Sequence, residues 1–336
     1  MSTLLVTGAA GFIGSNFVRL ALQNGHKVIG LDSLTYAGRR ENLENLPHGE
    51  RFKLIVDDIR SPHVGDLFRA IRPDAVLNFA AESHVDRSIA NPLLFVETNV
   101  LGTGNLLHHS LQLWQEKPSF RYLQVSTDEV YGSLGETGKF TENSPLAPSS
   151  PYSASKASAD HLVNAWHHTY GLPTVITRCS NNYGPYQFPE KLIPHMIRCA
   201  IAGESLPVYG DGSNVRDWIH VEDHCEGILQ ALLEGKPGST YCLGGNHELR
   251  NLDLVKAICR ELDRTKPRAD GETYETQIQF VTDRLGHDYR YAIDDTNARA
   301  QIGFVRKHNF EGGLRATVSW YLNNENWIKA VTAMKI

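Results

Sequence analysis

The first residues of the chain combine a short apolar run with a glycine-rich turn. Leu4-Leu5-Val6 predicts a buried strand, and it leads directly into Thr7-Gly8-Ala9-Ala10-Gly11-Phe12-Ile13-Gly14, which opens a helical pattern ending near Gly25. Glycines at such a turn let the backbone approach a pyrophosphate closely, and the N-terminus of the following helix supplies amide donors. The spacing is G-x-x-G-x-x-G, and glycine turns between strand and helix also occur for packing reasons. This order of elements nevertheless favours an α/β fold.

An acidic residue follows the second predicted strand. Residues 27–31 form that strand, and Asp32 comes 18 residues after Gly14. An acid at this place fits the ribose hydroxyls of an adenine dinucleotide and repels a 2′-phosphate, so NAD is favoured over NADP. Arg39 and Arg40 could serve a phosphate, but a solvated loop explains them more simply.

Further apolar runs alternate with helical patterns. Strands are predicted over residues 54–56, 75–79, 122–125 and 174–177. Asn91-Pro92 begins a helix that ends near Trp114, because Asn can cap a helix and Pro suits its first position. Alternation of this kind predicts an α/β fold with a doubly wound parallel sheet of the Rossmann type. We expect residues 1–180 to form the NAD-binding domain, with later segments returning to it, and residues 181–336 to form a smaller, interleaved substrate domain.

The chemistry is predicted to centre on two segments. Ser126-Thr127-Asp128-Glu129-Val130-Tyr131-Gly132 follows the strand at 122–125, so its adjacent carboxylates should emerge at the carboxyl edge of the sheet. A helical pattern begins at Tyr152 and places Lys156 one turn further on the same face. Tyrosine has a pKa of about 10, and a neighbouring cation would lower it, which makes this pair a candidate acid and base. A surface helix with an ordinary Tyr and Lys is the alternative.

Composition excludes several classes of protein. The chain has 336 residues, 41% of them hydrophobic, and a net charge of −5, which is typical of a globular protein and gives no basic field for nucleic acid. No apolar run approaches the ~18 residues of a membrane helix, and Met1 leads directly into a strand, so we expect a cytoplasmic protein. The five cysteines contain no C-x-x-C pair and the histidines no H-E-x-x-H, so no metal site is expected.

Taken together, these motifs resemble the extended short-chain dehydrogenase/reductase superfamily and, within it, the dTDP-glucose 4,6-dehydratases. The glycine turn, Asp32 and Tyr152-x-x-x-Lys156 resemble the superfamily, and the run from Ser126 to Gly132 resembles the dehydratases. Further likeness lies in Ala80-Ala81-Glu82-Ser83-His84, Asn181-Asn182-Tyr183-Gly184-Pro185, Asn214-Val215-Arg216-Asp217-Trp218 and residues 283–288.

The resemblance implies a reaction and roles for the central residues. dTDP-glucose would become dTDP-4-keto-6-deoxyglucose and water through C4 oxidation, C5/C6 elimination and hydride return to C6 from tightly bound NADH. Tyr152, assisted by Lys156 and Thr127, would take the C4 hydroxyl proton. Glu129 would remove the C5 proton, and a protonated Asp128 would donate to the departing C6 hydroxyl.

The family pattern also carries over to binding residues. For NAD it gives Gly8, Gly11, Phe12, Ile13, Gly14, Asp32, Ser33, Leu34, Thr35, Asp58, Ile59, Ala80, Ala81, Thr98, Tyr152, Lys156 and Asn182. For the nucleotide sugar it gives Ser83, His84, Thr127, Asn181, Lys191, Leu192, Pro207, Val208, Tyr209, Arg216, Asn251, Asp283, Arg284, His287 and Asp288, with Arg216 expected at the diphosphate.

Three other functions are compatible with parts of this set of motifs. A 4,6-dehydratase acting on another nucleotide sugar would differ only in contacts to the base. A nucleotide-sugar 4-epimerase shares the oxidation but has no use for Asp128 and Glu129. A non-catalytic NAD-binding regulator would not need the intact set of reactive side chains. Family members are commonly dimers joined through the helices that begin near Pro92 and Tyr152, so we expect a homodimer.

Overall fold

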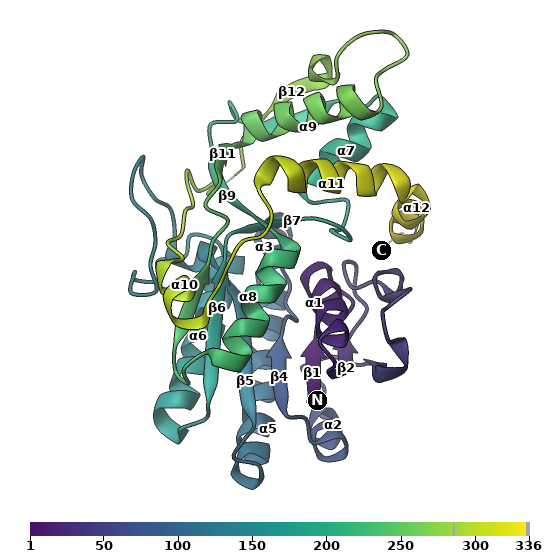
Figure 1. Cartoon of the computed structure of the whole chain (residues 1–336). Coiled ribbons are helices and arrows are strands. Elements are labelled where there is room, and N and C mark those ends of the chain that lie inside the picture. Colours follow the sequence, from purple (N-terminus) through teal and green to yellow (C-terminus); the bar gives the residue numbers. More distant parts are fainter. Residues whose placement is uncertain (285, 334–336) are drawn as a thin grey trace.

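A parallel β-sheet forms the centre of the computed structural model, which describes residues 1–284 and 286–333 (Figure 1). Its seven strands are ordered β10-β6-β5-β4-β1-β2-β3, and every neighbouring pair is parallel. The strands are β1 (Thr3–Thr7), β2 (Lys27–Asp32), β3 (Phe52–Val56), β4 (Ala75–Asn78), β5 (Arg121–Thr127), β6 (Thr174–Cys179) and β10 (Thr240–Leu243). The doubly wound parallel sheet predicted from the sequence is confirmed.

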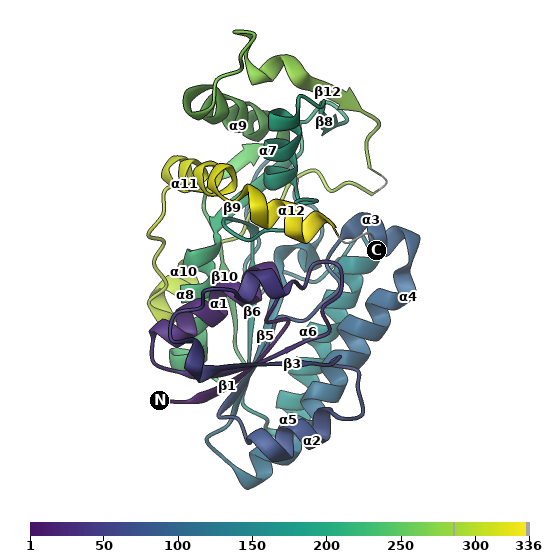
Figure 2. The ribbon, with the colours of Figure 1, turned by 90° about the vertical axis from the view of Figure 1, so that its right-hand side faces the viewer.

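Helices cover both faces of this sheet (Figure 2). One face carries α1 (Phe12–Gln23), α8 (Val221–Glu234) and α10 (Thr296–Ile302), and the other carries α2 (Val64–Ile71), α5 (Thr103–Glu116) and α6 (Pro151–Tyr170). Successive strand residues point to opposite faces, so Leu4 and Val6 join one hydrophobic cluster while Leu5 joins the other. Burial on both faces explains why these strands read as continuous apolar runs.

The helix expected from residue 91 to residue 114 is interrupted. After α3 (Val85–Ala90), the chain forms α4 (Pro92–Phe95), then a π-helical turn η3 (Val96–Gly102), and only then α5. Within η3, the Asn99 side chain accepts from the Glu82 amide at 2.9 Å and donates to the Glu82 carbonyl at 3.0 Å and to Ser155 Oγ at 2.8 Å. The π turn therefore ties the segment that follows β4 to helix α6.

Most of the later elements pack together beyond one end of the large sheet (Figures 1 and 2). A three-stranded sheet contains β7 (Asn181–Tyr183), β9 (Val215–His220) and β11 (Glu248–Arg250), and β8 (Leu206–Tyr209) pairs with β12 (Ile278–Val281). The helices are α7 (Leu192–Ala202), α9 (Asn251–Thr265), α11 (Phe310–Asn323) and α12 (Glu325–Ala333). Short 3-10 turns are η1 (Arg40–Leu43), η2 (Gly49–Arg51), η4 (Asp128–Tyr131) and η5 (Tyr274–Gln277).

Two hydrophobic clusters contain residues from the later part of the chain. One cluster joins α1 and the large sheet to Ile219, Val221 and Cys225, whereas another is built around Tyr183, Trp218 and α9. Residues after 180 therefore contribute to both. Within the described ranges, no helix is both long and apolar enough to cross a membrane.

Candidate active site

The glycine turn between β1 and α1 is shaped by close backbone contacts. Gly8 has a φ of 64°, and a Cβ atom there would lie 2.7 Å from the Ala80 amide nitrogen. Gly11 is the N-cap of α1, and no side chain among residues 1–284 and 286–333 caps this helix end. The first amides of a helix have no partner within the helix, so this turn presents N–H groups to a ligand and suits an anion.

Asp32 lies at the carboxyl end of β2, beside this turn. Its Oδ2 accepts from the Ala10 amide and its Oδ1 from the Leu34 amide, both at 2.8 Å. Burial raises the pKa of Asp32, while the two amide donors act in the opposite direction. The carboxylate is thus fixed in orientation at the cavity wall.

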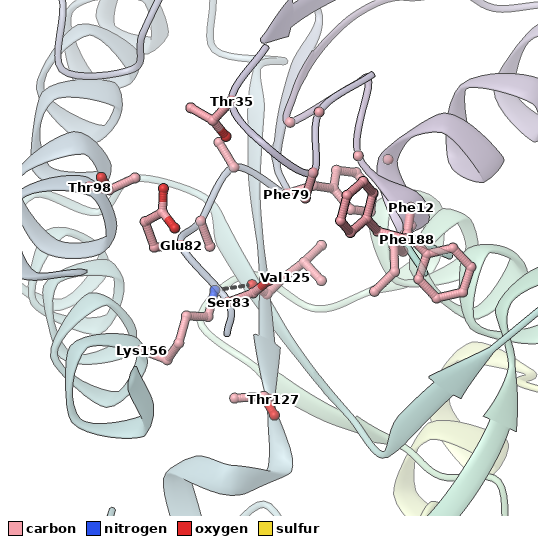
Figure 3. A pocket seen from close by; sticks show the side chains of 18 of the residues that line it. Phe12, Thr35, Phe79, Glu82, Ser83, Thr98, Val125, Thr127, Lys156 and Phe188 are labelled. Atoms are coloured by element: carbon pink, nitrogen blue, oxygen red, sulfur yellow. Dashed lines mark hydrogen bonds between the residues drawn. The ribbon is translucent and has the colours of Figure 1, made fainter. Parts of the chain in front are cut away.

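A first cavity runs along the carboxyl edge of the sheet (Figure 3). Every residue predicted for the cofactor except Leu34 lines it. Thr35 and Thr98 stand on the same side of the view as Lys156, while Phe12 and Phe188 close the opposite side. The Leu34 main-chain amide donates to Asp32 Oδ1, which does line the cavity.

The predicted carboxylate pair occupies turn η4, directly after β5. Thr127 caps this turn by accepting from the Glu129 amide. Asp128 is fully buried; its Oδ1 accepts from Thr127 Oγ1 at 3.3 Å, and its Oδ2 has no hydrogen-bond partner among the described residues. Burial, followed by the charges of Glu129 and Asp217, raises the pKa of Asp128 well above its usual range.

Glu129 experiences a different balance of charges. Burial raises its pKa, while the nearby cations Arg216 and Lys191 oppose that rise. Its side chain lines both this cavity and a second one. Two adjacent carboxyls therefore differ in the charges around them, which favours the neutral form at Asp128 more strongly.

Helix α6 brings Tyr152 and Lys156 to the same cavity. It begins with Pro151 and a capping box between Ser150 and Ser153. Burial and the charge of Glu129 raise the pKa of Tyr152 well above 10, while a hydrogen bond with Thr127 opposes the shift. The Lys156 ammonium donates to the Val125 carbonyl at 2.7 Å (Figure 3).

The expected lowering of the Tyr152 pKa by Lys156 is therefore not found in this structure. The desolvation of a fully buried phenol outweighs the neighbouring cation, which is directed to a main-chain carbonyl. Burial also lowers the pKa of Lys156 itself.

A second cavity adjoins the first beneath the smaller group of elements. The two share Ser83, Glu129, Asn181, Asn182 and Lys191 among their walls. Of the residues predicted for the nucleotide sugar, Thr127 lines only the first cavity and Asp283 lines neither. The Asp283 side chain is half exposed and bonds His287 Nδ1 at 2.7 Å; its neighbour Leu285 lies outside the described residues.

Three cations surround the second cavity. The Arg216 guanidinium donates to the carbonyls of Val215 at 2.8 Å and Asp288 at 3.0 Å, and no carboxylate within the described ranges is close enough to form an ion pair with it. Arg284 pairs with Asp86 at 2.7 Å, and Lys191 donates to a carbonyl. A buried arginine without a carboxylate partner is suited to a phosphate.

Sequence reasoning missed several wall residues. Phe188 and Glu190 line the first cavity although they belong to residues 181–336, which were expected to form the substrate domain. Tyr36 lines the same cavity from the loop after β2. Trp218 and Tyr291 line the second cavity. Trp218 stood within a quoted motif, whereas nothing in the sequence distinguished Tyr36 or Tyr291.

One cluster of two histidines and a glutamate has the residue types of a metal site. Ligand atoms of His220, Glu222 and His308 lie within 4.8 Å of one another, but the two imidazole rings stack at 4.0 Å with planes 25° apart. Nearly parallel rings cannot direct their in-plane lone pairs at one ion. Hydrogen bonds to Asp223 and Glu222 raise the pKa of His308 to about 9, so it acts as a cation between carboxylates.

Known proteins resemble this chain over nearly its whole length. A family model described as GDP-mannose 4,6 dehydratase matches residues 5–317. A dTDP-glucose 4,6-dehydratase of Xanthomonas campestris pv. campestris (strain B100) is 55% identical over 337 residues, covering 98% of this chain and 96% of the relative.

Solved structures extend the likeness to the fold. DesIV, a dTDP-glucose 4,6-dehydratase from Streptomyces venezuelae with NAD and TYD bound, is 45% identical with a TM-score of 0.90, covering 98% of this chain and 99% of DesIV. A UDP-glucose 4-epimerase of Thermotoga maritima with UDP-glucose is only 26% identical, with a TM-score of 0.86 and coverage of 96% and 99%. The chain belongs to the dTDP-glucose 4,6-dehydratase family of extended short-chain dehydrogenases/reductases.

Proposed function

We propose that this chain converts dTDP-glucose to dTDP-4-keto-6-deoxyglucose and water, with NAD in the first cavity and the nucleotide sugar in the second. The observation that carries the proposal is the pair formed by buried Asp128 and half-buried Glu129, which lines the first cavity and, through Glu129, also the second. The name and function of the relatives support it.

The first cavity fits NAD. The uncapped start of α1 offers amides to a pyrophosphate, and Asp32 offers a fixed carboxylate to ribose hydroxyls while repelling a 2′-phosphate. When bound, NAD supplies a hydride acceptor for C4, a hydride donor for C6 and a positively charged nicotinamide ring.

Tyr152 is assigned the first proton transfer. In its phenolate form Tyr152 accepts the proton of the C4 hydroxyl and becomes a neutral phenol, and Thr127, which is hydrogen-bonded with Tyr152, orients that oxygen. Because burial raises the pKa of Tyr152, its phenolate depends on positive charge gathered around it, and Lys156 is the nearest cation on its own helix.

Glu129 and Asp128 are assigned the elimination. Oxidation at C4 acidifies the C5 hydrogen, and Glu129 removes it as a base whose ionised form is stabilised by Arg216 and Lys191. Asp128 stays protonated because of its burial and donates to the departing C6 hydroxyl. An epimerase has no use for this second acid–base pair, which argues against that alternative.

Arg216, Arg284 and Lys191 are assigned to the diphosphate, since they place positive charge around the second cavity. Pro207, Val208 and Tyr209, at strand β8, are assigned to the base. We further propose the division expected from the sequence, in which residues 1–180 bind NAD and residues 181–336 bind the sugar nucleotide, with α8 and β10 returning to the large sheet.

The active form is proposed to be a cytoplasmic homodimer. Support comes from apolar side chains exposed along α3, α4 and η3, namely Ile89 (42%), Leu93 (69%), Val96 (44%) and Leu101 (63%). Leu93→Asp should convert the protein to a monomer in sedimentation, whereas Val305→Asp, at an equally exposed position far along the chain, should not. A wild-type protein that sediments as a monomer would contradict the dimer.

The activity is tested by mass spectrometry of products. The protein, supplied with NAD, is incubated separately with dTDP-glucose, UDP-glucose, UDP-N-acetylglucosamine and GDP-mannose. Loss of one water from dTDP-glucose, faster than from the other three, is expected. Faster dehydration of another nucleotide sugar would overturn the assignment of the base.

A further inference from the structure

A buried ion pair lies beneath the proposed active site and takes no direct part in the chemistry assigned above. Arg178 Nε, on β6, donates to Asp160 Oδ2, on α6, at 2.9 Å. Asp160 is fully buried and Arg178 is only 4% exposed. Two charges in the protein interior carry a large desolvation cost and stabilise a fold no better than apolar side chains of similar volume. The ion pair between Asp160 and Arg178 is therefore expected to have a role other than stability.

Asp160, one member of the pair, lies near Lys156. Asp160 follows Lys156 by one turn of α6, so both side chains lie on the same helix face. Burial lowers the pKa of Lys156, and Asp160 is the largest opposing influence, followed by Cys179. The other charged or titratable groups nearby are Tyr152 on α6, Tyr122 on β5, Asp128, Glu129 and Tyr131 on η4, and Arg178 on β6.

The other end of the pair reaches the carboxylate turn. Arg178 Nη1 donates to the Tyr131 hydroxyl at 2.8 Å, and its guanidinium lies 4.9 Å from the centroid of that ring. Tyr131 is the last residue of η4, the turn that presents Asp128 and Glu129. The Tyr131 ring also stacks on Phe140, with the two ring centroids 5.0 Å apart. The position of the turn thus depends on a fixed guanidinium.

We propose that Asp160 and Arg178 are positioning residues that serve the two stages of the reaction separately: Asp160 keeps the Lys156 ammonium charged for the oxidation at C4, and Arg178, through Tyr131, holds Asp128 and Glu129 for the elimination. This inference rests on the proposed function. These roles would explain why the chain keeps the charged side chains of Asp160 and Arg178 in its interior, where apolar side chains could also pack.

The role of Asp160 in the oxidation and the role of Arg178 in the elimination can be tested separately. Asp160→Asn should narrow the pH profile of C4 oxidation from its alkaline side by about one pH unit, because the Lys156 ammonium then loses its proton at lower pH and no longer stabilises the Tyr152 phenolate. Tyr131→Phe keeps the ion pair, so oxidation should keep its pH profile, while deuterium exchange at C5 should slow about tenfold. The control Tyr241→Phe also removes a buried hydroxyl, on β10, and should change neither stage.

A double variant separates positioning from a merely structural role. In the double variant Asp160→Leu/Arg178→Met, apolar side chains replace both charges, so no buried charge is left unpaired. The thermal stability of this variant should therefore equal that of the wild type. The narrowed pH profile should nevertheless persist. A double variant with the wild-type profile, or a Tyr131→Phe variant that behaves like Tyr241→Phe, would overturn the proposal.

The holoenzyme is used throughout, with bound reduced NAD reporting oxidation and mass spectrometry reporting exchange. If the double variant does not fold, the comparison of Tyr131→Phe with Tyr241→Phe decides by itself. A wild-type protein that fails to oxidise dTDP-glucose would refute the proposed function, whereas an active wild type with unaffected variants would refute only this inference.

Discussion

Replacing Glu129 by Gln should separate the oxidation from the elimination. Glutamine keeps the shape of the side chain between the two cavities but cannot accept a proton. A positioned general base contributes roughly 10²–10⁴-fold in rate, or about 3 to 5 kcal/mol of barrier. Deuterium exchange at C5 should fall by that factor, while Tyr152 and Thr127, which serve the first step, are untouched.

The assay follows both steps in one sample. Bound reduced NAD, detected by its near-ultraviolet absorbance, reports oxidation at C4, and mass spectrometry after incubation in deuterated water reports exchange at C5. Glu97→Gln, at an exposed site on η3, removes the same charge and should change neither signal. Unimpaired exchange in Glu129→Gln would show that another group is the base.

Three further predictions address the acid, the diphosphate site and stability. Asp128→Asn should slow the loss of water about 100-fold and deuterium exchange at C5 much less, because the asparagine amide cannot protonate the departing C6 hydroxyl. Equal decreases in the two rates would refute the assignment of Asp128 as the acid. Arg216→Ala should raise the Michaelis constant for dTDP-glucose far more than it lowers turnover, and an unchanged constant would count against its role at the diphosphate. The buried His224 has its pKa lowered to about 3 by desolvation, so the stability it contributes is complete above pH 6.5 and is lost progressively towards pH 3. Between pH 7 and pH 5, urea unfolding of His224→Gln should therefore lose about 2 kcal/mol less stability than unfolding of the wild type does; equal losses in the two proteins would contradict this cause.

The sheet was predictable because its first six strands are short apolar runs that alternate with helical patterns. Strand β10 was missed because Thr240–Leu243 lies among elements of the smaller group, and only tertiary pairing with β6 brings it into the large sheet. The π turn η3 was missed for another reason. It changes the hydrogen bonding of the backbone without interrupting the helical pattern of apolar residues.

The site was predictable where residues follow strands, since the carboxyl ends of parallel strands meet at one edge. Thr127, Asp128 and Asp32 were found in this way. Residues after 181 came from family resemblance, because no periodicity relates β8 or β9 to the cavity they help to build. The pKa of Tyr152 could not be predicted from the sequence. Lys156 was visible as its neighbour, but the burial that raises the pKa of Tyr152 was not.

The most direct test is the position of solvent deuterium in the product. The protein is incubated with NAD and dTDP-glucose in deuterated water, and the product is analysed by mass spectrometry and nuclear magnetic resonance. A 4-keto-6-deoxy sugar that has lost one water and carries one deuterium at C5 is predicted. An isomer with the mass of the substrate would mean epimerisation, and would contradict the roles of Asp128 and Glu129 on which the account depends.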